Sequence, residues 1–471
     1  MNKKNILIAT HNMMTGGCET YILTLCCELI KQGFNISVVA KDGTLRKKFE
    51  ELNVKVHIID FFKRENAIDN IEIIKNIIKS DEIDVVHIHP TYPMFEVVLA
   101  CIFLNIPYYL FFHGVTLEGY FDINNSFLAL GKWGPSYIKE VAFKYAKNYV
   151  YVSEEVREFY EKNYNLDVKK GILLKNSIYC KQNEIDLEYP LKKFIIISRI
   201  DTDKIDSIKI GINAYIKYYE ECKQKYGKEI EGISLDIVGT GNEIDNLEMY
   251  IEKLDYNIKC IGETDDSVDI IKNYDVLMGM GRTVIEGISN KKIVLLISYN
   301  KYVGLVNSFD INKMDTVSFA NFSGRNMEAI NIDEDICGII NLSKEEIKRI
   351  VDNNYIYILE NNNISKNIKN LQEHDKISEY CYSDDAIKVA NEYYELVKYI
   401  ITLEKENLRY TDMIQMNNEK YNENLNYLKS ENEEKEKIIE ENRLIIDKYK
   451  NNLNNIYNKK LYKIYSFFRR K

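Results

Sequence analysis

Proline, tryptophan and long apolar runs are scarce in this chain. Its 471 residues include five prolines and one tryptophan. No segment approaches the roughly 20 consecutive apolar residues of a membrane-spanning helix, so the sequence predicts none. The first ten residues hold two lysines and one short apolar run, which indicates a β-strand and not a signal peptide. We therefore expect a cytoplasmic protein.

A net positive charge and closely spaced pairs of cysteines that could bind a metal are lacking as well. The formal net charge is −9, which argues against a nucleic-acid partner. The nine cysteines are scattered, and none forms a Cys-x-x-Cys pair. We interpret them as reduced side chains, mostly small buried hydrophobes, as expected in the cytoplasm.

Short apolar runs alternate with helical patterns through most of the chain, as in doubly wound α/β proteins. The runs are nearly continuous, as strands buried on both faces should be. The polar stretch 181–192 divides them into two series, which predicts two tandem Rossmann-like domains, 1–180 and 181–387, facing across a cleft. The expected strands are 5–10, 35–40, 55–60, 84–89, 108–113, 149–153 and 172–175, then 194–198, 234–238, 257–261, 274–278 and 292–297.

From about residue 388 the pattern becomes helical and highly charged, which predicts a helical extension over 388–458. Within it, 425–456 carries a heptad seam in which seven of ten positions are apolar. This favours a coiled coil that pairs with itself or with a partner helix. The alternative is a single long solvated helix.

The last segment, 459–471, holds six basic residues and no acidic one. Its apolar and aromatic side chains can share one face of a helix, as in an interfacial anchor. Each cation near an anionic leaflet contributes on the order of 1 kcal/mol. The segment therefore predicts peripheral binding to the inner face of the cell membrane, with an ordinary basic tail as the alternative.

The most informative stretch is 274–287, where an apolar strand runs into Gly279, Gly281 and Arg282, and Glu286 follows about one helical turn later. Glycines there let backbone N–H groups approach an anion at a helix N-terminus. A glutamate can accept hydrogen bonds from sugar hydroxyls. The pattern is typical of a nucleotide-sugar site, and a tight strand-to-helix turn is the alternative.

Other strand ends carry residues of the same chemistry. Arg199 and Lys204 follow the strand 194–198, and such a pair can hold a diphosphate. Asp201 and Asp203 lie between them and could ligate a divalent cation, which we consider the weaker interpretation because two cations are already present. The remaining candidates at strand ends are Gly16, Gly17 and Glu19 after the first strand, His113 after 108–113, Gly239 and Gly241 after 234–238, and Gly262 after 257–261.

In their order and spacing these motifs resemble glycosyltransferase family 4, whose members have the GT-B fold. The resemblance covers roughly residues 5–395. It implies that Gly16, Gly17 and Glu19 approach the donor phosphates and that His113 contacts the transferred sugar. It also implies that Arg199 and Lys204 bind the diphosphate, that the glycines at 239, 241, 262, 279 and 281 form donor loops, and that Glu286, the second glutamate of an E-x7-E motif, binds the ribose.

One position departs from that pattern. The first glutamate of E-x7-E should stand eight residues before Glu286, where this chain has Met278. Methionine cannot accept the hydrogen bonds of a carboxylate, so either the donor differs, Arg282 takes part of the role, or the enzyme is weakened. We interpret His87 and His89 as structural, with His89 as a weak candidate for the cleft.

The sequence thus predicts a retaining, metal-independent glycosyltransferase that needs no cofactor and uses a nucleotide-diphosphate sugar. The expected acceptor is a saccharide or lipid-linked saccharide in cell-surface polysaccharide or glycolipid assembly. Two alternatives stay open. One is a nucleotide-sugar epimerase on the same architecture, and the other is a non-catalytic coiled-coil protein with a degenerate transferase domain.

Overall fold

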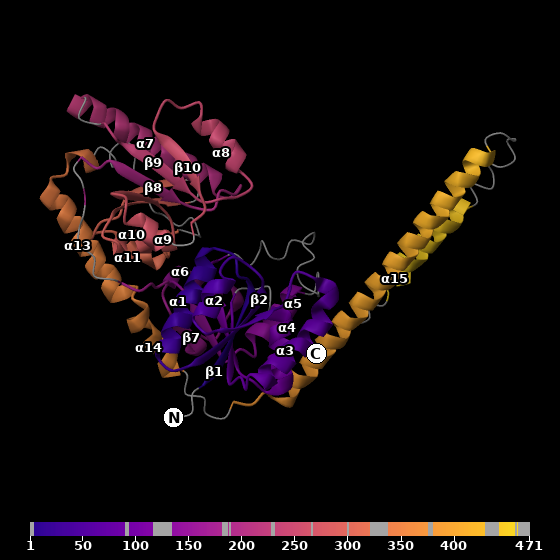
Figure 1. Ribbon diagram of the computed structural model, residues 1–471. Coiled ribbons are helices and arrows are strands. Elements are labelled where there is room, and N and C mark those ends of the chain that lie inside the picture. Colours follow the sequence, from indigo (N-terminus) through magenta and orange to yellow (C-terminus); the bar gives the residue numbers. More distant parts are fainter. Residues whose placement is uncertain are drawn as a thin grey trace.

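The computed structural model describes residues 4–89, 94–115, 134–180, 187, 190–227, 231–264, 267–298, 301–320, 338–374, 380–428, 442–456 and 459. Two sheets with helices on their faces form the body, and a helical arm extends from it (Figure 1).

The first sheet has seven parallel strands in the order β3-β2-β1-β4-β5-β6-β7. Its strands are β1 (Asn5–Asn12), β2 (Asn35–Lys41), β3 (Lys55–Ile58), β4 (Val85–Ile88), β5 (Tyr108–Phe112), β6 (Asn148–Tyr151) and β7 (Gly171–Leu173). The described helices around it are α1 (Gly17–Lys31), α2 (Arg46–Glu51), α3 (Ala67–Ser80), α4 (Met94–Leu104), α5 (Gly134–Tyr137), the π-helix Ile138–Phe143 and α6 (Glu154–Tyr164).

The second sheet has six strands in the order β10-β9-β8-β11-β12-β13. Its strands are β8 (Lys193–Ile197), β9 (Ser234–Val238), β10 (Ile258–Gly262), β11 (Val276–Gly279), β12 (Ile293–Ser298) and β13 (Lys301–Leu305). The described helices of this domain are α7 (Ile205–Tyr226), α8 (Ile244–Ile251), α9 (Ser267–Ile271), α10 (Arg282–Ser289), α11 (Ile311–Thr316) and α13 (Lys344–Asn361).

The predicted pair of doubly wound domains is confirmed, and each expected strand is present within a residue or two of its predicted ends. The added element is β13, which pairs antiparallel with β12. It follows β12 almost directly, so no separate apolar run announced it.

The domain boundary predicted at 387 differs from the packing. After α13 the chain returns to the first domain, where residue 363 bridges to Ile178. Buried side chains of α14 (Ile364–His374) and of the first part of α15 (Asp384–Leu428), such as Ile368 and Val397, belong to the first domain's core. An amphipathic pattern shows that a helix buries one face but does not show which domain receives it.

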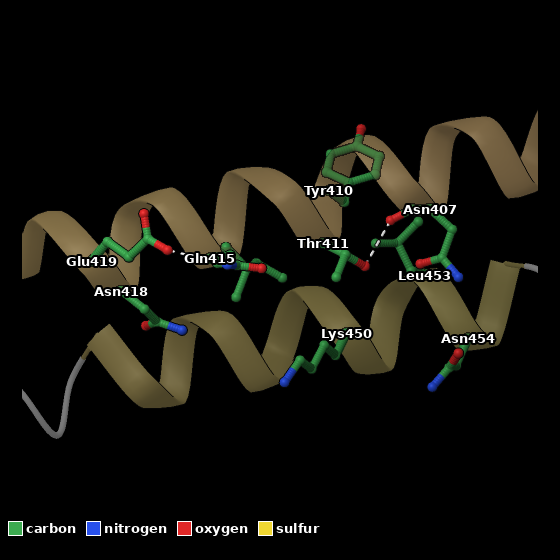
Figure 2. Close-up of a pocket in the computed structure, with 10 residues that line it drawn as sticks. Asn407, Tyr410, Thr411, Gln415, Asn418, Glu419, Lys450, Leu453 and Asn454 are labelled. Atoms are coloured by element: carbon green, nitrogen blue, oxygen red, sulfur yellow. Dashed lines mark hydrogen bonds between the residues drawn. The ribbon is translucent and has the colours of Figure 1, made fainter.

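The coiled-coil prediction also needs correction. Residues 442–456 form a helix that lies antiparallel beside α15, with Leu453 near Asn407 and Lys450 near Thr411 (Figure 2). One continuous helix over 425–456 is therefore wrong. The heptad spacing did not show the reversal, because a helix that continues and one that folds back have the same periodicity.

The basic segment predicted as a membrane anchor lies outside the described residues except for Lys459. Within the described part of the chain, no helix has both the length and the apolar character needed to cross a membrane.

Candidate functional site

The candidate residues gather where the strand order of each sheet reverses. In the first sheet the reversal lies between β1 and β4, and in the second between β8 and β11. Open α/β sheets bind ligands beyond the carboxyl ends of the strands at such points. Residues 16–19 follow β1, Arg199 follows β8, and the loop 280–282 follows β11.

Glu19 lies in the first turn of α1, whose N-cap is Gly16. A side chain at Gly16 would collide with the Glu19 carboxylate, which gives this glycine a steric role. Burial raises the pKa of Glu19 to about 7, although the charge of Arg199 in the other domain acts to lower it. His11 Nε2 lies 3.5 Å from Glu19 Oε1, and burial lowers the pKa of His11 to about 4. A neutral imidazole therefore faces a carboxyl group that titrates near neutrality.

His113 follows β5 and shares a hydrogen bond with His89, 2.9 Å from its Nε2 to His89 Nδ1. Burial lowers the pKa of His113 to about 3 and that of His89 below its usual value. Both rings are therefore neutral near pH 7, and one N–H is shared between them. His89 is fully buried and lies against Phe111 with ring centroids 4.1 Å apart. His89 thus holds the ring of His113 in place, a link that sequence analysis missed.

On the donor side, Arg199 is exposed and Lys204 is mostly buried at the start of α7. Burial lowers the pKa of Lys204 to about 8, with a smaller contribution from the charge of Arg199. Lys204 Nζ lies 3.2 Å from Met280 Sδ in the loop after β11. An anionic ligand beside this ammonium would favour its charged form and raise its pKa again.

Asp201 and Asp203, the weaker metal candidates, both engage Arg199. The distances are 2.5 Å from Arg199 Nη1 to Asp201 Oδ2 and 3.4 Å from Nη2 to Asp203 Oδ2. Asp201 also accepts a hydrogen bond from the backbone N–H of Asn242 at 3.2 Å. In this arrangement the two carboxylates orient the guanidinium group, and the absence of a metal stays a prediction.

Several predicted glycines have a packing role. A side chain at Gly239 or Gly241 would collide with backbone atoms of residues 198 and 200, so the loop after β9 lies directly on the loop that carries Arg199. Gly281 caps α10 at a φ of +61° that favours glycine, and its N–H donates to Phe319 O. Gly262 has a φ of +81° at the end of β10, and Gly279 ends β11. Their contact with a donor stays a prediction.

Met278, which stands where the family has a glutamate, is not in the loop. It is fully buried in β11, between Ile196 of β8 and Leu295 of β12. The side chain at this position faces the core of the sheet. Having methionine here in place of glutamate therefore takes no side chain away from the donor side of the sheet. In the loop that follows, Met280 lies beside Lys204.

Arg282 joins the two domains. Its Nε donates to Glu286 Oε1 at 3.1 Å, and its Nη2 donates to Thr24 Oγ1 of α1 at 2.7 Å. Its Nη1 donates to Ser177 O at 2.9 Å and to Asn176 Oδ1 at 3.3 Å. A guanidinium group has five N–H donors, and four contacts are already made within the protein.

Glu286 is buried and paired with Arg282, with 7% and 9% of the two side chains exposed. This glutamate therefore anchors the link between the domains, and its contact with a ribose stays a prediction. The sequence held no sign of Thr24, Asn176 or Ser177 as partners, because they lie more than 100 residues away from Arg282.

Two doubly wound domains whose strand-reversal points meet at Glu19, Arg199 and Arg282 define the GT-B class of fold. Solved structures support this. A glycosyltransferase from Rickettsia africae aligns over 80% of this chain and all of its own, with a TM-score of 0.57 and 18% identity. Anabaena HepE, solved with UDP and glucose, aligns over 79% of this chain and 98% of its own, with a TM-score of 0.55 and 12% identity.

Staphylococcus aureus TarM, in a mutant form solved with fondaparinux, alpha-GlcNAc-glycerol and UDP, has a TM-score of 0.55 and 13% identity over 79% of this chain and 99% of its own. Residues 15–179 match the family model described as Glycosyltransferase Family 4. No curated protein matches the sequence. The chain thus has the GT-B fold of these glycosyltransferases, and its first domain is similar to glycosyltransferase family 4 over residues 15–179.

Proposed function

We propose that this glycosyltransferase moves a sugar from a nucleotide-diphosphate donor to a hydroxyl acceptor, with retention of configuration and without a metal. The carrying observation is that Arg199 of one domain lies close enough to Glu19 of the other for its charge to lower the pKa of that carboxyl group. Lys204 lies on the same side as Arg199, whose charge in turn lowers the pKa of Lys204. HepE and TarM were solved with UDP, which makes a uridine nucleotide the first donor to try.

In this mechanism the negative charge that develops on the departing diphosphate is received by Arg199, Lys204 and backbone N–H groups near Gly16 and Gly281. Asp201 and Asp203 hold the Arg199 guanidinium ready, so it need not reorganise during bond cleavage. His113, neutral and oriented by His89, can donate one hydrogen bond to the transferred sugar.

Calorimetric titration of the full chain with UDP-, GDP-, ADP- and CDP-sugars tests the donor site. We expect one donor to bind, equally with and without EDTA, and Lys204→Ala to weaken that binding. Lys259→Ala is the matched control, because Lys259 is exposed on β10 of the same domain and should leave binding unchanged. Loss of binding in EDTA would refute the metal-independent mechanism, and no binding to any donor would favour the non-catalytic alternative.

The proposed acceptor is a saccharide that is assembled for the cell surface. The basic-aromatic segment 459–471 would hold the enzyme at the inner face of the membrane, beside a saccharide or lipid-linked saccharide. Deleting 459–471 should shift the protein from the membrane pellet to the supernatant on centrifugation of lysed cells. An unchanged distribution would remove the membrane from the proposal and leave the donor site unaffected.

A further inference from the structure

The described side chains in the outer part of the arm are almost all exposed to solvent. Among the side chains described at 405–420 and 442–456, none is buried. Only Ile414 on α15 and Ile446 and Leu453 on the return helix are even partly buried. A helical hairpin gains most of its stability from packing an apolar face. Three half-buried side chains are too few for that, so the hairpin needs a further partner.

The space between the two helices leads to the same conclusion. A groove of about 420 Å³ separates them (Figure 2). Ile414 and Leu453 line it together with polar side chains such as Asn407, Asn418 and Lys450. The inner face of the hairpin is thus open and largely polar, and its apolar side chains lie elsewhere.

Five of the eight exposed large apolar side chains described on the two helices share one outer face, and the other three, Leu408, Met416 and Leu444, lie on other sides. On the return helix, Ile446 and Leu453 mark the side that faces α15. At about 100° per residue, three other side chains lie within about 40° of one another and to one side of those two: Ile445, Tyr449 and Ile456. All three are exposed, as are Tyr410 and Met413 on α15.

On α15, Tyr410 and Met413 lie about 40° and 100° from Ile414, in the same rotational sense. On both helices the apolar side chains are turned in the same sense, about the helix's own axis, from the side that faces the other helix. In an antiparallel pair, such turns lead to the same side of the hairpin. The five side chains therefore form one apolar face across it. We call this the arm face.

We propose that a second copy of this chain covers the arm face, so that two hairpins pair into an intermolecular four-helix bundle. The outer part of α15, residues 405–428, is about 36 Å long, the return helix 442–456 is about 22 Å long, and each helix is about 10 Å wide. The described arm thus offers about 600 Å² per chain, about three quarters of the roughly 800 Å² per partner of stable interfaces. A two-fold pairing needs only one self-complementary face, which the hairpin has.

The charges of the two helices also favour a second copy. Residues 405–428 carry four acidic and three basic side chains, a net charge of −1. Residues 442–456 carry one acidic and three basic side chains, a net charge of +2. A two-fold axis parallel to the helices places α15 of each chain against the return helix of the other, so the opposite charges meet. The same axis makes every neighbouring pair of helices antiparallel, as in many four-helix bundles.

The test compares two adjacent residues, Leu444 and Ile445, whose side chains point about 100° apart on the return helix. At about 100° per residue, Leu444 lies roughly opposite Ile446 and Leu453, away from the arm face. It is as exposed as Ile445, so Leu444→Glu is a matched control for Ile445→Glu combined with Tyr449→Glu. The molar mass of each full-length protein is measured by light scattering after size-exclusion chromatography, and helical content by circular dichroism.

We expect twice the mass of one chain for the unmodified protein and for Leu444→Glu, and the mass of a single chain for the double variant. A single-chain mass for the unmodified protein would overturn the proposal, whether or not the variants fold. Equal dissociation of the two variants would show that the arm face was assigned wrongly. These masses do not depend on a donor, so the result is independent of the proposed activity.

Discussion

Lys204→Ala and Arg199→Ala are each expected to lower turnover about 10²- to 10³-fold while leaving the fold intact, as when one preorganised donor of an oxyanion site is removed. Arg199 is exposed, so its removal leaves no cavity. Lys204 is mostly buried and lies 3.2 Å from Met280 Sδ and 3.9 Å from Asp203. Steady-state rates with the donor identified by calorimetry measure both losses.

The pH dependence gives a second readout for the same site. Burial lowers the pKa of Lys204 to about 8, so the ammonium is charged at pH 7 and loses its proton as the pH rises through 8. A diphosphate binds the charged form, so donor affinity should fall above pH 8. In Lys204→Arg this fall should move to higher pH, because a guanidinium group stays protonated. Near-normal turnover in both alanine variants would rule out this diphosphate site.

Arg282→Ala is expected to cost about 3–5 kcal/mol of stability, the usual result of leaving one partner of a buried ion pair uncompensated. Glu286 would lose its hydrogen bond from the charged Arg282 side chain. Thr24 and Ser177 would lose their link to the other domain at the same time. Urea denaturation followed by circular dichroism measures the change, and a loss below about 1 kcal/mol would contradict a buried pair.

Two further variants separate the ion pair from general damage. Removing both charges together, as Arg282→Met with Glu286→Gln, should recover part of the lost stability, because no lone charge then stays buried. Arg46→Ala breaks a pair with the same four-residue spacing, 2.8 Å from Arg46 Nε to Glu50 Oε1, on the surface of α2. It should change stability very little, because water and ions screen exposed pairs.

The strands could be predicted from the sequence because each is a short, nearly continuous apolar run, a local property that burial on both faces requires. The order of the candidate residues after those strands was equally local. Arg199, Lys204 and Glu19 were found in this way, and the structure brings them to one boundary between the domains.

Long-range packing was not visible in the sequence. The predicted strand 274–278 contains Met278, but the sequence did not show that this side chain is buried between the two neighbouring strands. Arg282 meets Thr24 across 258 residues, and no local pattern records such a pair. The sequence predicted a helical extension from about residue 388 without showing that Val397 packs on the first domain, and it assigned Ile364 to the second domain. For the same reason it missed the reversal of the arm.

Because the arm folds back, the C-terminal segment 459–471 begins close to the body of the protein. The return helix runs back toward the part of α15 that leaves the body, because Leu453 and Asn454 lie opposite Asn407. Thirteen residues, 459–471, span at most about 45 Å when fully extended. If this segment binds the membrane, it therefore keeps the two sheets near the bilayer. The tip of the arm then lies about 36 Å away from the point where the segment begins.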